Sequence, residues 1–87
     1  MILHLLHNVE LLSNALALLS KNDRLIITDT KASEIAIQSL ESCVGSIAML
    51  DDIDVHPSSS AARRIERISA ESWVTEAINT KDVISWG

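Results

Sequence analysis

The chain begins with MILHLLH (residues 1–7), an almost unbroken apolar run that leads directly into a segment with helical periodicity. The first consecutive polar residues are His7 and Asn8. Strands that are buried on both faces, as the central strands of parallel sheets are, have this continuous apolar pattern. The run therefore predicts a central, fully buried strand, and the rest of the chain is expected to cover its two faces.

A helix is expected to follow this strand. Asn8 is a suitable N-cap, and Glu10 lies in the first turn, where its negative charge favours the helix dipole. From Val9 to Lys21 the polar and small residues recur every three or four positions, which leaves a wide apolar face to pack on a sheet. We expect Asn22 to end the helix in a left-handed conformation. The apolar face comprises Leu11, Leu12, Ala15, Leu16, Leu18 and Leu19.

The pattern of strand and helix then repeats. Residues 24–28 form a second apolar run, rich in β-branched residues, and predict a second buried strand. A helix is expected from Lys31 to about Ser42, ended by Gly45, and residues 46–50 predict a third strand. This alternation is typical of a parallel sheet with right-handed crossover connections.

The last third of the chain adds two strands and a helix. Residues 55–62 include the only proline and three consecutive serines, which predicts a loop. Residues 64–68 alternate polar and apolar side chains, as a strand near a sheet edge does. Ser69 is expected to cap a helix, and residues 83–86 predict a final short strand. The apolar stripe of the helix comprises Ala70, Trp73, Val74, Ala77 and Ile78.

Length and composition set the fold class. The 87 residues predict a single domain, residues 1–87, of the α/β class with a mostly parallel five-stranded sheet. Hydrophobic residues make up 47% of the chain, without Phe or Tyr, so the core is expected to be aliphatic. A domain of this size buries only about 60–65% of its unfolded surface. This limited burial favours an oligomer, in which partners cover more of the surface.

Charge and cysteine content argue against several functional classes. Twelve acidic residues against seven basic ones give a net charge of −5, so direct nucleic-acid binding is not expected. The single cysteine, Cys43, cannot form an internal disulfide or a cysteine-based zinc site, which suits a reducing compartment. No basic leader opens the chain, and no apolar run reaches the roughly 18–20 residues of a membrane span. We therefore expect a soluble, cytoplasmic protein with no membrane contact.

Acidic residues gather after the predicted strands. Asp51, Asp52 and Asp54, with His56, follow the third strand, and Asp29 follows the second. Open α/β sheets place ligands beyond the carboxyl ends of their strands, so a hard-metal site is one interpretation of these residues. Helix caps and solvated turns are the favoured interpretation, and no bound cofactor is expected.

The histidines and tryptophans of the predicted elements have structural interpretations. His4 and His7 are three positions apart on a strand, so their side chains are expected on opposite faces and cannot share a metal ion. Trp73 is expected to anchor its helix in the core. Trp86 is expected at an interface, because so large an apolar side chain favours burial against a partner. Both tryptophans are therefore candidates for subunit contacts.

The two ends of the chain carry the most distinctive pattern. It comprises the opening strand Met1-Ile-Leu-His4, the strand at residues 24–28, Trp73 near the start of the last helix, and the closing residues Lys81-Asp-Val-Ile-Ser-Trp86. This pattern resembles the TusB/DsrH family over nearly the whole chain, most specifically from Trp73 to Trp86. The resemblance implies a three-layer α/β/α sandwich of the DsrEFH type on a mostly parallel five-stranded sheet.

The resemblance also implies a function. Family members assemble with two related subunits of the same fold, TusC/DsrF-like and TusD/DsrE-like, into a cytoplasmic heterohexamer that relays persulfide sulfur. The sulfur goes to 2-thiouridine at the tRNA wobble position or, in sulfur oxidisers, into dissimilatory sulfur metabolism. By this resemblance the chain is expected to be a non-catalytic subunit of such a sulfurtransferase complex, most simply in tRNA modification.

Two departures from the family pattern bear on Cys43. Asp29 is followed by Thr30 where the family commonly has an acidic residue and Gly, and Leu16–Leu19 stand where some DsrH-type members carry a cysteine. No Lys or Arg lies within ten residues of Cys43 to favour the thiolate that persulfide transfer requires. A small, partly buried core residue is the favoured interpretation of Cys43. An active sulfur carrier that uses Cys43 as the persulfide acceptor is the alternative hypothesis.

Overall fold

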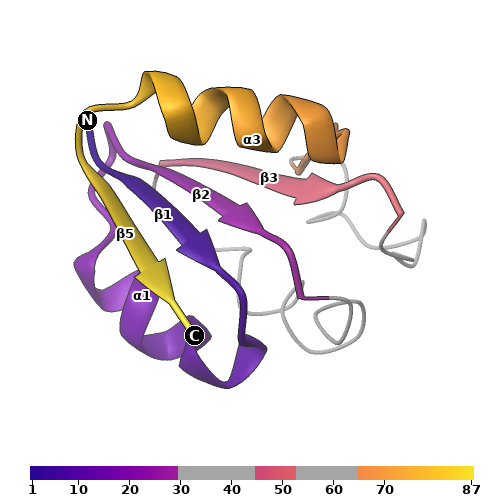
Figure 1. The fold of residues 1–87 in the computed structure, drawn as a ribbon. Helices are drawn as coiled ribbons and strands as arrows, with labels where there is room; N and C mark the ends of the chain where they lie inside the picture. The colour runs from indigo at the N-terminus through magenta and orange to yellow at the C-terminus, as the bar shows by residue number, and fades with distance from the viewer. Residues whose placement is uncertain (30–44, 53–64) are drawn as a thin grey trace.

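A five-stranded, all-parallel β-sheet forms the centre of the structure (Figure 1). The computed structural model describes residues 1–29, 45–52 and 65–87. The strands lie in the order β4-β3-β2-β1-β5. They are β1 (Leu3–Leu6), β2 (Arg24–Ile27), β3 (Ser46–Leu50), β4 (Glu66–Ile68) and β5 (Val83–Trp86). The prediction of an α/β fold with five mostly parallel strands is confirmed.

β1 is an interior strand that is buried along its whole length. It pairs with β2 on one side, where Leu3 lies opposite Arg24, and with β5 on the other, where Leu3 lies opposite Val83. The nearly continuous apolar sequence suits this location, because both faces of an interior strand in a parallel sheet are covered. The prediction from the opening apolar run is confirmed.

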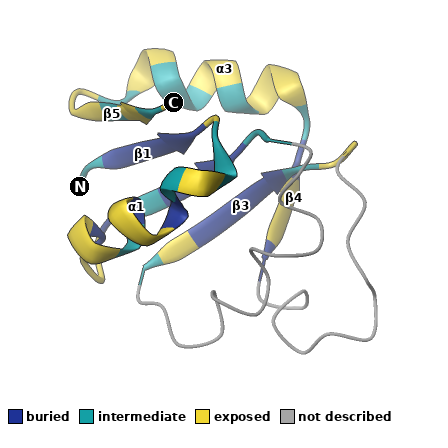
Figure 2. Cartoon of the chain, turned by 90° about the horizontal axis from the view of Figure 1, so that it is seen from below, coloured by how far each residue is buried: buried dark blue, intermediate teal, exposed yellow. Residues whose placement is uncertain are grey.

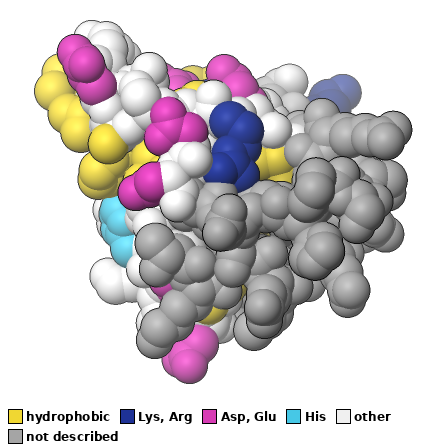
Figure 3. Space-filling view, turned by 90° about the vertical axis from the view of Figure 1, so that its right-hand side faces the viewer, with side chains coloured by type: hydrophobic (Ala, Val, Ile, Leu, Met, Phe, Trp, Pro, Cys, Tyr) yellow, Lys and Arg dark blue, Asp and Glu magenta, His cyan; other side chains and the backbone are white. Residues whose placement is uncertain are grey.

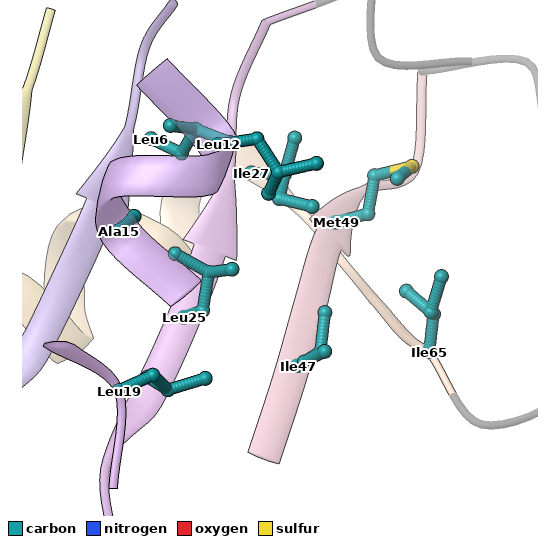
Figure 4. Close-up of a cluster of buried hydrophobic side chains, with 9 residues drawn as sticks. All are labelled: Leu6, Leu12, Ala15, Leu19, Leu25, Ile27, Ile47, Met49 and Ile65. Atoms are coloured by element: carbon teal, nitrogen blue, oxygen red, sulfur yellow. The ribbon is translucent and has the colours of Figure 1, made fainter. Parts of the chain in front are cut away.

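Helices lie on both faces of the sheet. The 3-10 turn η1 (Val9–Leu11) and α1 (Leu12–Leu18) lie on one face, and α3 (Ala70–Asn79) lies on the other (Figure 1). Figure 2 shows buried strands beneath helices whose outer surfaces are exposed. The core cluster of the α1 face (Figure 4) comprises Leu6, Leu12, Ala15, Leu19, Leu25, Ile27, Ile47, Met49 and Ile65. The core cluster of the α3 face comprises Leu3, Leu5, Ile26, Ala48 and Ile68.

The first helix begins where the sequence predicts. The Asn8 side chain accepts a hydrogen bond from the Glu10 backbone N–H at 3.0 Å, which confirms the N-cap. Leu12 and Ala15 are buried against the sheet, as expected. Leu18 is 61% exposed, so its assignment to the apolar face is wrong. Leu18 lies three positions after the buried Ala15, but it is the last residue of the helix.

The same helix ends earlier than predicted. It stops at Leu18 instead of reaching Lys21, and Asn22 has no positive φ, so the predicted left-handed stop is wrong. The physical reason is Asp23, whose carboxylate accepts the Ser20 backbone N–H at 3.1 Å. The Asp23 backbone N–H donates in return to the Ser20 carbonyl oxygen at 2.9 Å. These two bonds close a turn in place of another turn of helix.

α3 begins at its predicted cap but buries only part of its apolar stripe. The Ser69 hydroxyl oxygen accepts a hydrogen bond from a backbone N–H of the first turn at 3.1 Å, which confirms the N-cap. Trp73 and Ala77 pack against the core cluster of this face. Val74 and Ile78 are exposed. The apolar stripe is therefore wider than the part of the helix that contacts the sheet.

The sheet ends in two short edge strands, β4 and β5. In β4 only Ile68 is buried, whereas Glu66 and Arg67 are exposed. The alternating pattern of residues 64–68 predicted such a strand near a sheet edge, and its position is confirmed. The edge strand β5 lies beside the central strand β1.

Candidate functional site

The chain topology singles out one end of the sheet. From β1 to β4 the strands progress in one direction, whereas β5 lies on the other side of β1. The order of the strands thus reverses between β1 and β5, and open parallel sheets place ligands at such a switch point, beyond the carboxyl ends of the strands. The first residues beyond the strand ends there are His7 after β1, Thr28 after β2 and Gly87 after β5.

His7 presents one free ring nitrogen at this end of the sheet. The Thr28 hydroxyl donates its single hydrogen to the Leu6 carbonyl oxygen at 3.2 Å. The same hydroxyl oxygen lies 2.6 Å from His7 Nδ1, so Nδ1 must carry a hydrogen and donate it. In the neutral ring, Nε2 therefore keeps its lone pair. His7 is exposed, and its Nε2 makes no hydrogen bond within the described part of the chain.

The half-buried Trp73 forms a neighbouring wall of this site. Its indole meets the His7 imidazole edge to face, with ring centroids 5.8 Å apart and an interplanar angle of 71°. Figure 3 shows a histidine side chain at the surface next to hydrophobic side chains. Trp73 Nε1 is buried and has no hydrogen-bond partner among the described residues. The site thus combines an exposed nitrogen lone pair with an apolar wall, and it can accept a proton or a hydrogen bond.

On the opposite face of β1, His4 belongs to a buried polar chain. The half-buried Trp86 donates from Nε1 to His4 Nδ1 at 3.2 Å, and His4 Nε2 donates to Asp23 Oδ2 at 3.3 Å. The rings of His4 and Trp86 stack with centroids 6.3 Å apart. His4 is completely buried and both its nitrogens are occupied, so its role is structural. The expected placement of His4 and His7 on opposite faces is confirmed.

Asp23 is the acceptor at the end of this chain. Its Oδ1 accepts the Ile2 backbone N–H at 3.0 Å, and its Oδ2 accepts the Ser20 backbone N–H at 3.1 Å. These two backbone donors, with a smaller contribution from His4, hold the pKa of the Asp23 carboxyl well below its usual range despite the opposing effect of burial. One carboxylate thereby connects the start of β1, the turn after α1 and, through His4, strand β5.

Only part of the predicted metal-binding group lies in the described residues. Asp51 and Asp52 are exposed in the turn after β3. Asp29 Oδ2 accepts the Val9 backbone N–H at 2.8 Å and so serves the start of the first helix. Among the described residues, no three potential metal-binding side chains come together. Of the candidate site residues predicted from the sequence, three lie outside the described ranges: Cys43, Asp54 and His56.

Sequence reasoning missed the pair formed by His7 and Thr28. The signal is present in the register of the two strands, in which Leu6 lies opposite Ile27. The residues that follow, His7 and Thr28, are therefore neighbours across the strand ends. Periodicity alone does not supply this register, because it identifies strands without saying which residues face each other.

A shallow groove also runs between β4 and α3. Arg24 crosses beside it and forms ion pairs with Glu66 at 3.0 Å and with Glu76 at 2.6 Å. These pairs offset part of the acidic charge of the groove, and we interpret the group as a partly solvated structural network. The groove is lined by Glu66, Ile68, Ser69, Glu71, Ser72, Thr75 and Glu76.

Comparison with protein-family models, curated proteins and solved structures finds no match for the chain. Within residues 1–29, 45–52 and 65–87, no helix has the length and apolar character needed to cross a membrane.

Replacing each tryptophan by phenylalanine is expected to give different results. Trp86→Phe removes the donor to His4 Nδ1 and leaves a buried acceptor unsatisfied, which should lower the free energy of unfolding by about 1–3 kcal/mol. Trp73→Phe removes no hydrogen bond seen among the described residues, so it should cost only the contact area lost on truncation, less than Trp86→Phe. Urea unfolding followed by circular dichroism measures both. Equal losses would contradict the role assigned to Trp86 Nε1.

Proposed function

We propose that the chain is a TusB/DsrH-like structural subunit of a cytoplasmic sulfur-relay complex. In this proposal it adopts the three-layer α/β/α sandwich of the DsrEFH type and binds two related subunits of the same fold, one of which supplies the reactive cysteine. The pathway that fits the resemblance most simply is 2-thiolation of the tRNA wobble uridine. The pattern at the chain ends supports the proposal, and so does the all-parallel five-stranded sheet.

The observation that carries the proposal is a set of exposed aliphatic side chains on α3 and β5. Ile78 is 76% exposed, Val74 is 45% exposed and Val83 is 38% exposed, and no residue of α3 is fully buried. We call these three residues the α3–β5 patch. Large apolar side chains left exposed on so small a domain favour a protein partner.

The contacts of α3 indicate where the patch faces. On one flank of the helix, Glu76 pairs with Arg24 and lines the groove beside β4. Trp73 and Ala77 face the sheet. In the patch, Val74 follows Trp73 by one position and Ile78 follows Ala77 by one position. This offset places Val74 and Ile78 on the flank of the helix opposite Glu76. That flank overlies the side of the sheet that ends in β5.

Strand β5 adds an edge to the patch, because among the strands that the structure describes it pairs only with β1. The carbonyl oxygens of Asp82 and Trp86 accept hydrogen bonds from β1 and the residue after it, both at 2.9 Å. Because alternate residues of a strand direct their backbone groups to opposite sides, Val83 and Ser85 direct theirs away from β1. The Val83 side chain lies on the α3 face, since it pairs with Leu3. A free edge beside apolar side chains suits a subunit that covers or extends the sheet.

Co-expression tests the proposal. With a TusC/DsrF-like and a TusD/DsrE-like subunit, the chain is expected to form an equimolar complex in native mass spectrometry. A Cys43→Ser variant should support full sulfur transfer in that complex. A well-folded monomer with no affinity for the related subunits would contradict the proposal. Loss of transfer in the Cys43→Ser complex would instead favour a sulfur-carrier role for Cys43.

A charge placed in the α3–β5 patch is expected to weaken assembly without unfolding the domain. Ile78→Glu should reduce affinity for the partner subunits by at least about tenfold, because a desolvated charge in an apolar contact costs more than about 1.4 kcal/mol. Its unfolding free energy should change by no more than about 0.5 kcal/mol, as for other exposed sites. Leu18→Glu is the matched control, since Leu18 is also exposed but lies on α1. Analytical ultracentrifugation of both complexes decides the outcome, and equal affinities would exclude the patch as the interface.

A further inference from the structure

We propose that His7 is the proton acceptor for a thiol that a partner subunit presents at the carboxyl ends of β1 and β5. The inference rests on the proposed function, which places the reactive cysteine on a neighbouring subunit. Thiolates, and not thiols, attack sulfur, so a persulfide relay needs a group that removes the thiol proton. His7 has the position, the exposure and the free lone pair that this task requires.

Thr28 fixes the ring of His7 in the form that accepts a proton at Nε2. The Thr28 hydroxyl gives its hydrogen to the Leu6 carbonyl oxygen and therefore receives the hydrogen of His7 Nδ1, 2.6 Å away. The hydrogen bond at one ring nitrogen determines the protonation of the other. Thr28 is thus a positioning residue, and it continues to accept from Nδ1 after Nε2 has been protonated.

The remaining contacts of His7 hold the ring in one place. Its backbone N–H donates to the Trp86 carbonyl oxygen at 2.9 Å, and its ring lies against Trp73 of α3. Thr28, just after β2, and Trp73 of α3 therefore contact the imidazole itself, and β5 fixes the backbone of His7. A base that is already oriented does not lose that freedom when the thiol arrives, which favours proton transfer. Val83 of the α3–β5 patch pairs with Leu3, at the opposite end of β1 from His7, so the partner is proposed to extend along β5 and reach both.

The proposed step balances without a further reagent. His7 Nε2 takes the proton of the thiol, the S–H electron pair stays on sulfur, and an imidazolium forms. The thiolate attacks the outer sulfur of a donor persulfide, a new S–S bond forms, and the original S–S bond breaks. The departing thiolate of the donor then takes the proton back from Nε2. No net oxidation or reduction occurs, and His7 returns to its starting form.

Strand β1 itself contains a comparison residue. His4 lies on β1, three residues before His7, but it is completely buried, and its nitrogens are engaged by Trp86 and Asp23. A reagent that modifies imidazole lone pairs in the folded protein, such as diethyl pyrocarbonate, should therefore modify His7 and spare His4. The third histidine, His56, is removed by working in a His56→Gln background.

The decisive experiment measures persulfide transfer in the reconstituted complex. His7→Gln should lower the single-turnover rate by about 10²-fold or more, the usual contribution of a general base. Thr28→Val should lower it by about tenfold, because it only releases the ring. Added imidazole should restore much of the rate to a His7→Ala complex, an effect that a structural role of His7 does not produce. Nitrogen NMR of the isolated protein should show hydrogen on His7 Nδ1 in the wild type and a shift towards Nε2 in Thr28→Val.

The outcomes separate this inference from the proposed function. If the variant complexes assemble with unchanged affinity and transfer is slow but recovers with imidazole, His7 is the proton acceptor. If they assemble and transfer at the wild-type rate, the inference is overturned and the structural-subunit proposal stands. If the wild-type chain does not bind the related subunits at all, the proposed function fails and the assignment of His7 fails with it.

Discussion

Asp23→Asn is expected to destabilise the fold strongly, although it conserves the size and shape of the side chain. The two carboxylate oxygens of Asp23 accept three hydrogen bonds, from Ile2, Ser20 and His4. An amide offers one acceptor oxygen, so in either orientation its NH₂ group faces at least one N–H donor. The donors that lose their acceptor are left unsatisfied, which costs more than removing both partners of a hydrogen bond would. The urea midpoint at about pH 7 should fall well below that of the wild type.

The same carboxylate predicts a loss of stability in acid. The pKa of Asp23 in the folded state lies below the value of about 3.9 for an unperturbed Asp, so below about pH 5 the unfolded state binds more protons than the folded state. Its contribution to stability is therefore fully present above this range and is lost as the pH falls towards the folded-state pKa. Asp23→Asn has no carboxyl at this position, and its stability should depend less on pH in this window.

Urea unfolding of both proteins between about pH 7 and pH 3 measures the effect. Asp52→Asn is a suitable control, because Asp52 is exposed in the turn after β3 and its change should leave the midpoint nearly unaltered. The expected result is a gap between wild type and Asp23→Asn that is widest at neutral pH and narrows in acid. A gap of constant width would show that the charge of Asp23 contributes nothing to the stability of the fold.

Most of the strands could be predicted from the sequence because their signals are local. A buried parallel strand needs a continuous apolar run, and the runs at residues 3–6, 24–27 and 46–50 can be read without knowing their neighbours. The caps at Asn8 and Ser69 were predictable for the same reason, since each cap bonds a backbone group within three residues of itself.

The features that were missed or wrong depend on contacts between distant residues. The early end of the first helix is the exception, because Asp23 bonds Ser20 only three residues away, a turn that helical periodicity does not indicate. The pairing of His4 with Trp86, 82 positions apart, requires β5 to lie beside β1. His7 meets Thr28 only through the register of β1 and β2. These two pairings follow from the strand order and register, which hydrophobic periodicity does not determine.

The turn that Asp23 stabilises also explains the second large effect that we expect, at Gly45. Gly45 has φ +88°, a left-handed conformation that side-chain-bearing residues rarely adopt. A Cβ at this position would lie 2.9 Å from the Asp23 carbonyl oxygen and 2.9 Å from that of Ser20. The Asp23 oxygen cannot retreat without cost, because it accepts the Ser46 backbone N–H that begins β3. Strain and crowding therefore act on the same few atoms.

Gly45→Ala should accordingly lower the free energy of unfolding by about 1–3 kcal/mol from the backbone conformation alone, and by more once the crowding of the two carbonyl oxygens is included. Chemical ligation at Cys43 gives access to the matched control, D-alanine at position 45, whose side chain takes the mirror-image position and which favours positive φ. The D-alanine protein should be at least as stable as the wild type, because it restricts the unfolded chain without straining the folded one. Thermal unfolding of the three proteins compares them. If L-alanine were tolerated as well as D-alanine, the close approach of residue 45 to the turn at Ser20 and Asp23 would not exist in solution.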